Sequence, residues 1–154
     1  MKLAEALMLR ADYQRRLEQL KQRLIRNAKA QEGIDPAEHP PLLVDEIERT
    51  SRELTRLIQN INRTNASTAL NDRMSIADAL AVRDALAWRQ AAYRDLAQAA
   101  SVVQDRFSRS EVRWRSTVDV TDIQRRADTL AIEYRELDTR IQEKNWLTEL
   151  QELE

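Results

Sequence analysis

The sequence has no cysteine, one glycine and three prolines among its 154 residues. The absence of cysteine excludes disulfides, thiol catalysis and cysteine metal sites, although it does not fix the compartment. The single histidine, His39, lies in a proline-rich loop, and the chain has no Glu-x-x-His pair, no glycine-rich phosphate loop and no serine–histidine pairing. We therefore expect no cofactor and no metal site, and the sequence favours a protein that is not an enzyme without deciding the question.

A strong net charge is also missing, since 25 basic and 26 acidic residues give a net charge of −1. No global field therefore attracts nucleic acid or an anionic membrane. The opening MKLAEALMLRADYQ carries polar side chains from Glu5 onward, so it does not resemble a secretory signal. No later segment is apolar enough to span a bilayer. We expect a cytoplasmic protein without a membrane span.

What the sequence does contain is the composition of long amphipathic helices. Hydrophobic residues make up 42% of the chain and charged residues 33%, with few helix-breaking residues among them. A chain of this length can bury one sizeable core. The sequence therefore predicts a single helical-bundle domain over residues 1–154.

Apolar residues recur at alternating steps of four and three along four segments, which is the spacing of helices that pack side by side. Helix starts are marked by Pro41, by the capping-box-like run from Ser75 to Asp78, and near Asp119. The first predicted helix covers residues 3–30, with an apolar seam of Tyr13, Leu17, Leu20 and Leu24, and the second runs from 41 into the INRTN stretch (61–65), with Leu43, Ile47, Leu54, Ile58 and Ile61. The third begins at 75, and its seam is Val82, Leu86, Arg89, Tyr93, Leu96, Ala100, Val103 and Phe107. The fourth begins at 119, and its seam is Ile123, Ala127, Leu130, Tyr134, Leu137 and Ile141.

Helices of about 30 residues are about 45 Å long, and none of them buries its apolar stripe alone. We therefore predict an all-α fold, an antiparallel up-down four-helix bundle with long helices. A second apolar stripe of the third helix, formed by Ile76, Leu80 and Ala87, favours self-association as a homo-oligomer. A thick bundle core is the alternative explanation of that stripe.

The run EVRWRSTVDV, residues 111–120, breaks the helical pattern, because apolar and polar residues alternate in it with a period of two. We predict a short extended segment near 111–118. A lone strand leaves backbone groups unpaired, so this one needs a partner. The candidates are the loop at 66–74 and the same segment of another subunit.

Several motifs occur in a familiar order. The opening MKLAEAL-x-x-RAD, the central INRTN, the DAL-x-x-RD of the third helix, the SRSE before TVDV and the closing IQEKNW together resemble the septicolysin-like family of bacterial proteins. The resemblance spans nearly the whole chain. It implies a bacterial protein, and the family name suggests a cytolysin, which would be an exported, membrane-active protein. It supplies no catalytic residues to carry over.

The INRTN stretch is the first candidate binding site. Asn62 and Asn65 are three residues apart, so they share a helix face, and they continue the apolar stripe toward the core. Their amides and the Arg63 guanidinium would then form a polar pocket for an anionic or amide-bearing ligand. The structural alternative is that Asn65 ends the second helix in a left-handed conformation, while Asn62 and Thr64 satisfy its last carbonyl groups.

Arg83 and Asp84 of the third helix form the second candidate site. Arg83 lies between Leu80 and Ala87 on the apolar side, where a charge is costly unless it is paired. In an antiparallel bundle the end of the second helix meets the start of the third. We therefore expect a buried network that joins Arg83 to Asn62, either as part of a ligand site or as a purely structural feature.

The run RFSRSEVRWR, residues 106–115, contains a secondary candidate patch. Its members are Arg109, Ser110, Glu111 and Arg113. Basic residues interleaved with aromatic ones are typical of single-strand nucleic-acid binders. Four arginines in a neutral protein are a small footprint, however, so nucleic acid is not an expected partner. We expect Phe107 and Trp114 in the core or in an interface.

Together these observations favour a helical-bundle protein that acts by self-association or partner binding. The alternative is a small-ligand or nucleotide-binding protein, or a hydrolase, with its pocket at the INRTN stretch. The sequence does not specify the ligand of such a pocket.

Overall fold

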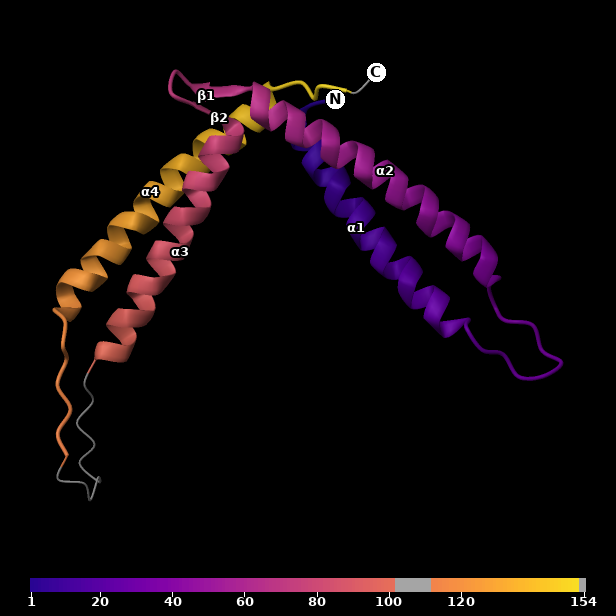
Figure 1. Ribbon diagram of the computed structural model, residues 1–154, viewed down its shortest axis with the longest axis horizontal. Helices are drawn as coiled ribbons and strands as arrows, with labels where there is room; N and C mark the ends of the chain where they lie inside the picture. Colours follow the sequence, from indigo (N-terminus) through magenta and orange to yellow (C-terminus); the bar gives the residue numbers. More distant parts are fainter. Residues whose placement is uncertain (102–111, 153–154) are drawn as a thin grey trace. The chain divides into compact units, whose positions relative to one another are not determined.

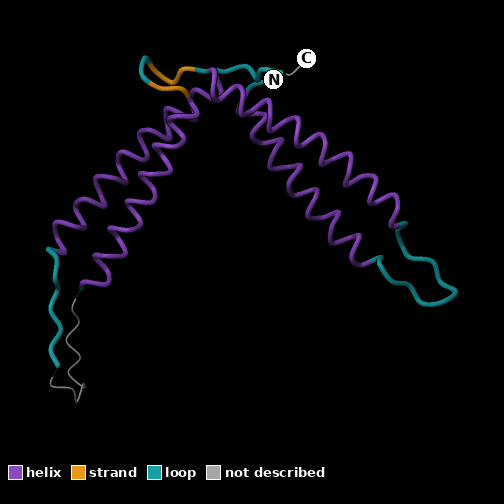
Figure 2. Tube along the Cα trace, viewed as in Figure 1, coloured by secondary structure: helices purple, strands orange, loops and turns teal. Residues whose placement is uncertain are grey.

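The computed structural model describes residues 1–101 and 112–152, and it is mainly helical, as predicted. Within these ranges four α-helices and one two-stranded sheet follow one another along the chain. In order, the elements are α1 (Leu3–Arg26), α2 (Pro40–Ser67), β1 (Ala69–Asn71), β2 (Met74–Ser75), α3 (Ile76–Ala100) and α4 (Val120–Leu147). Figures 1 and 2 show α1 beside α2, and α3 beside α4.

The chain divides into two compact units. The first unit comprises Met1–Ala69 with Gln142–Glu154, and the second comprises Leu70–Ile141. The helix pair α1–α2 belongs to the first unit, and the hairpin α3–α4 makes up most of the second. The expectation of one domain over residues 1–154 stays a prediction.

The seam between α1 and α2 follows the predicted spacing. Leu20 of α1 and Leu43 and Ile61 of α2 are buried, with 1%, 4% and 1% of their surface exposed. An ion pair from Arg16 to Glu46, 2.6 Å long, links the two helices at the edge of this core. The predicted stripe of α1 is therefore confirmed, and that of α2 is confirmed in part, because the buried Leu57 lies outside it.

The loop between α1 and α2 is held by side chains rather than by regular structure. The side-chain nitrogen of Asn27 donates to the carbonyl of Arg23 at 2.9 Å, and its oxygen accepts from the backbone N–H of Glu38 at 3.0 Å. The guanidinium of Arg23 in turn binds the Glu38 carboxylate. Gly33 has a φ of 80°, a conformation that other residues rarely adopt. α2 then begins at Pro40, within one residue of the predicted start.

A short β-hairpin leads into α3. The side-chain oxygen of Asn71 accepts hydrogen bonds from the backbone N–H groups of Arg73 and Met74, at 2.8 and 3.1 Å, which closes the turn between β1 and β2. Ser75 then caps α3, since its hydroxyl accepts from the N–H of Asp78 at 3.1 Å and its own N–H donates to the Asp78 carboxylate at 2.9 Å. The predicted capping box is confirmed.

α3 and α4 form an antiparallel hairpin. The predicted seam of α4 is confirmed, because Ala127, Leu130 and Ile141 are buried. The predicted seam of α3 is only partly confirmed. Leu86 is buried and Tyr93 half-buried, but Val82 and Leu96 are 44% and 38% exposed, and the residues that follow them in the sequence are less exposed. The side that faces α4 is instead occupied by Ile76, Ala79, Arg83, Leu86, Gln90, Tyr93 and Ala97, which are buried or half-buried. Alanine-rich α3 has apolar residues on two neighbouring stripes, so spacing alone does not choose between them.

The predicted short extended segment near 111–118 stays a prediction. Residues 112–118 belong to no strand, and Glu111 lies outside the described ranges. The two strands lie instead at 69–71 and 74–75, because the Asn71 turn lets this stretch pair with itself.

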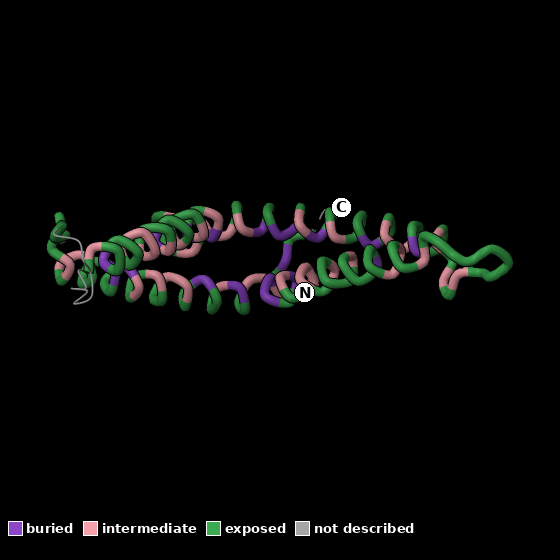
Figure 3. The backbone as a smooth tube through the Cα atoms, turned by 90° about the horizontal axis from the view of Figure 1, so that it is seen from below, coloured by how far each residue is buried: buried purple, intermediate pink, exposed green. Residues whose placement is uncertain are grey.

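Figure 3 shows how exposed positions alternate with buried ones along the helices. None of the helices in the described part of the chain combines the length and the apolarity that crossing a membrane requires.

Candidate functional site

The INRTN stretch lies inside α2 and does not end it. α2 continues to Ser67, and no non-glycine residue of the described ranges has a positive φ, so the predicted left-handed ending at Asn65 is wrong. Two hydroxyls in this part of α2 donate to carbonyls four residues back, as serine and threonine inside a helix commonly do. Thr64 donates to Asn60 at 2.8 Å, and Ser67 donates to Arg63 at 2.9 Å.

The polar residues of this stretch also face other directions than predicted. Asn62 and Arg63 are exposed and Asn65 is half-buried, whereas Asn60 and Thr64 are buried, with 7% and 0% of their surface exposed. The expectation that Asn62 points into the core is therefore wrong. The reason is the register of the seam, which steps from Leu57 through Ile61 to Thr64 rather than from Ile58 to Asn65.

The buried hydroxyl of Thr64 forms a hydrogen bond with the C-terminal segment of the chain. The backbone N–H of Gln151 donates to Thr64 Oγ1 at 2.9 Å. The two ends of the chain pair beside it, where Leu3 N–H donates to the carbonyl of Thr148 at 2.9 Å and Leu150 N–H donates to that of Met1 at 2.8 Å. The polar end of α2 is thus engaged by the protein's own backbone.

Replacing Thr64 with valine is expected to lower the free energy of unfolding by about 1 kcal/mol, because Gln151 loses its acceptor. Thr55→Val is the matched control, since Thr55 makes the same bond to Ser51, 2.9 Å long, on an exposed face. The control is expected to change stability by less than about 0.5 kcal/mol. Urea denaturation followed by circular dichroism measures both, and equal losses would contradict the role of Thr64.

An ionic contact reinforces the pairing of the chain ends. Glu149 lies 2.6 Å from Lys2 Nζ and 3.3 Å from the N-terminal ammonium group. The hydrogen bond from Lys2, followed by that from the N-terminus, holds the pKa of Glu149 below its ordinary value of 4.5. A carboxylate whose pKa is lowered by folding stabilises the folded state above its unfolded pKa.

The contribution of Glu149 is therefore fully present above pH 4.5 and is lost as the pH falls through its lower folded pKa. In Glu149→Gln, the fall in melting temperature on acidification from about pH 6 to about pH 3 is expected to be smaller than in the wild type. Glu143→Gln, at an exposed position of α4, is the control. Identical pH profiles of Glu149→Gln and the wild type would show that the contact contributes nothing.

Arg83 of α3 is paired, as its place on the apolar side predicts, but with a residue that sequence reasoning missed. Its Nη1 lies 2.7 Å from Asp138 Oδ1 of α4, and its Nη2 lies 3.8 Å from Asp84 Oδ1. The Nε of Arg83 is the one buried side-chain polar atom of the described residues without a hydrogen-bond partner. Asp84 itself is on the surface. The network with Asn62 stays a prediction.

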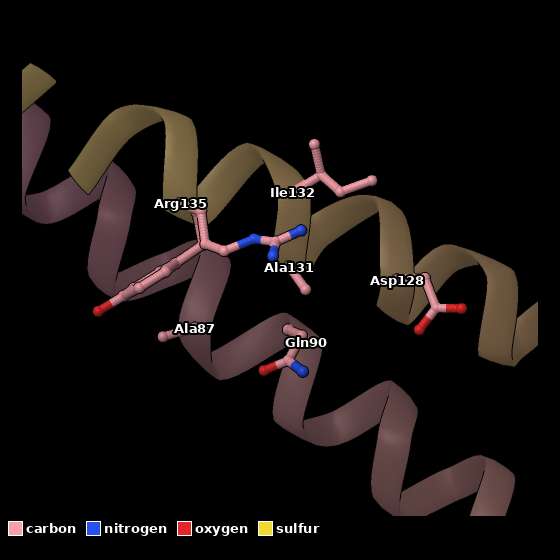
Figure 4. Close-up of a pocket in the computed structure, with 7 residues that line it drawn as sticks. Ala87, Gln90, Asp128, Ala131, Ile132 and Arg135 are labelled. Carbon is pink, nitrogen blue, oxygen red and sulfur yellow. The ribbon is translucent and has the colours of Figure 1, made fainter. Parts of the chain in front are cut away.

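A groove lies beside this ion pair, along one side of the α3–α4 hairpin. Its main cavity has a volume of about 460 Å³ and is lined by Ala87 and Gln90 of α3 and by Asp128, Ala131, Ile132, Tyr134 and Arg135 of α4. Figure 4 shows Asp128 and Arg135 projecting from α4 on either side of Ala131. A second cavity of about 310 Å³ shares Gln90 and Asp128 with the first, so the groove continues along the hairpin. We call these two cavities together the α3–α4 groove.

The groove combines a floor of small apolar side chains with a charged rim. Ala87 belongs to the second apolar stripe that the sequence predicts for this helix, and Ile132 at the rim is 48% exposed. Asp128 and Arg135 are exposed charges of opposite sign. Such a surface suits packing against another helix better than it suits catalysis.

The secondary patch is only partly described. Arg109, Ser110 and Glu111 lie outside the described ranges, and Arg113 is exposed in an irregular segment. Trp114 is 82% exposed, so it does not lie in a core, and its place in an interface stays a prediction. Phe107 lies outside the described ranges. No group of three or more His, Asp or Glu side chains that could hold a metal ion occurs within residues 1–101 and 112–152.

Comparisons with known proteins place the chain beside relatives whose functions are not known. Residues 10–150 match a family described as "Family of unknown function (DUF6847)". Among solved structures, a "functionally unknown conserved protein from Corynebacterium diphtheriae" is 47% identical, with a TM-score of 0.93, over 98% of this chain and 99% of that one. A search of the curated proteins finds no match. Neither description carries the septicolysin-like name that the motifs suggested.

Proposed function

We propose that this chain, which belongs to the DUF6847 family of unknown function, is a self-associating helical protein whose α3–α4 groove is its assembly surface. The observation that carries the proposal is the groove itself. It is an open surface with Ala87 and Ala131 in its floor and a half-exposed Ile132 at its rim. Apolar side chains arranged in this way are stabilised when a partner removes them from water.

The hairpin has more apolar surface than one helix pair can bury. Val82 and Leu96, which the sequence predicts to be in a seam, are 44% and 38% exposed. They lie about 140° and about 180° around α3 from Ala87, so they belong to another face of the hairpin than the groove. A two-helix unit buries one seam, and a stable core needs further helices against it. This excess of apolar residues supports assembly beyond the hairpin.

The sequence predicts an antiparallel four-helix bundle formed by the helices of one chain, whereas this proposal forms such a bundle between two copies. Two α3–α4 hairpins from two copies of the chain supply four antiparallel helices around a shared core. The competing arrangement is a bundle closed within one chain that leaves the groove unused, and it yields a monomer. The two arrangements therefore differ in the mass of the particle in solution.

Size-exclusion chromatography with light scattering measures that mass. We expect twice the 18.0 kDa mass of one chain at micromolar concentrations. A mass of 18.0 kDa across the whole concentration range would contradict self-association. The alternative function, ligand binding at the INRTN stretch, has less support, because the buried Thr64 there is already engaged by Gln151 while Asn62 and Arg63 face outward.

A further inference from the structure

We infer that the occupant of the α3–α4 groove is a second copy of this chain, docked with its α4 antiparallel to the first α4 about a two-fold axis between Ala131 and Ile132. The inference rests on the proposed self-association and goes further, because it assigns the register and the contacting residues. Ile132 of each copy enters the groove of the other, and Asp128 of each copy faces Arg135 of the other.

The first argument is charge. Asp128 and Arg135 are seven residues apart on α4, so they lie on one face about 10 Å from each other along the helix. The midpoint between them falls between Ala131 and Ile132. A two-fold axis through that midpoint brings Asp128 of one copy opposite Arg135 of the other, and the symmetry makes this contact twice.

The same charges exclude the parallel arrangement. If the two α4 helices ran in the same direction in register, Asp128 would face Asp128 and Arg135 would face Arg135. Like charges opposite each other in an interface repel and select against that pairing. The antiparallel register turns both repulsions into attractions without moving any residue.

The second argument is shape. Ala87 and Ala131 leave a cavity of about 460 Å³ at the centre of the proposed interface, and Ile132 stands half-exposed on its rim. A two-fold axis beside Ile132 carries each isoleucine across to the cavity of the other copy, so one residue serves both as the knob and as part of the hole. The apolar centre and the charged rim then match the usual anatomy of a protein interface.

Charge reversal tests the register. Asp128→Arg and Arg135→Asp are each expected to weaken the dimer at least about tenfold in Kd, because each variant places like charges opposite each other. The double variant with both reversals is expected to return to within about threefold of the wild-type Kd. Trp88→Gln is the control, since Trp88 is 74% exposed on α3 but does not line the groove. Reversals that leave Kd unchanged, or a double variant that stays as weak as the single ones, overturn the inference.

Cysteine crosslinking tests whether the two copies of residue 132 lie close together at the two-fold axis. The chain has no cysteine of its own, so only the introduced cysteine can react. Ile132→Cys is expected to form a covalent dimer with a short bismaleimide. Thr129→Cys, at an exposed position of α4 that lines a cavity without Ala131 and Ile132, is expected to stay uncrosslinked. A dimeric protein that does not crosslink through Ile132→Cys overturns this inference alone, whereas a monomeric wild type also overturns the proposed function.

Discussion

Ile61→Ala is expected to lower the free energy of unfolding by about 3 kcal/mol, the largest effect of a single substitution that we predict. Ile61 is 1% exposed and is the central side chain of the α2 seam beside Thr64, so its truncation leaves a cavity. Chemical denaturation followed by circular dichroism at the helical band measures the loss.

The neighbours of Ile61 are its controls. Asn62→Ala and Arg63→Ala change exposed side chains of the same helix turn, and each is expected to alter the free energy of unfolding by less than about 0.5 kcal/mol. The contrast identifies the INRTN stretch as part of a helix in which Ile61 and Thr64 face the core while Asn62 and Arg63 face outward. A loss at Asn62 as large as that at Ile61 would restore the buried polar site that the sequence suggested.

Asp138→Ala is expected to cost about 2 kcal/mol, because it leaves the half-buried guanidinium of Arg83 without its closest partner. The Arg83 and Asp138 side chains are 22% and 32% exposed, and solvent lowers the cost below that of a fully buried pair. Denaturation curves of the variant and of the wild type give the difference directly.

Arg83→Met is the informative counterpart of that variant. The unbranched methionine fills the space of the arginine stem and needs no charged partner, so it is expected to cost less than about 1 kcal/mol. A loss in Arg83→Met that exceeds the loss in Asp138→Ala would show that the guanidinium itself, rather than its pairing, stabilises the hairpin.

The predictions that succeeded rest on signals read within a few residues. Pro41 and the pair Ser75–Asp78 mark helix starts by their own backbone chemistry, and the structure has helices that begin at Pro40 and directly after Ser75. The seam of α4 was predicted correctly because its apolar residues form one stripe with polar residues on both sides. Where the signal is local, or where a helix has a single apolar stripe, no second helix boundary or seam register fits the sequence equally well.

Other predictions failed where two patterns competed. In α3, alanine at many positions makes neighbouring stripes almost equally apolar, so Val82 was predicted to lie in the seam although it is 44% exposed. In α2, asparagine and threonine have weak helix propensity and suggested an ending at Asn65, but Thr64 is buried and accepts the backbone N–H of Gln151, so this turn packs against the C-terminal segment. Tertiary contacts decided both cases.

The groove and its charges could be found in the sequence only in part. The second stripe of the third helix was predicted, and Ala87 of that stripe does line the cavity. Asp138 and Asp128 carried no signal of their own, because any exposed helix has acidic residues at such positions. Only the pairing of α3 with α4 in space brings Asp138 to Arg83 and sets Asp128 beside an apolar floor.

Sedimentation equilibrium of the wild type beside Ala131→Arg tests the central claim most directly. Ala131 is half-buried in the floor of the groove, so an arginine there blocks the cavity while its side chain reaches solvent. We expect the wild type at twice 18.0 kDa and the variant at 18.0 kDa with unchanged helix content. A monomeric wild type, or a variant that dimerises as well as the wild type, would contradict assembly through this groove.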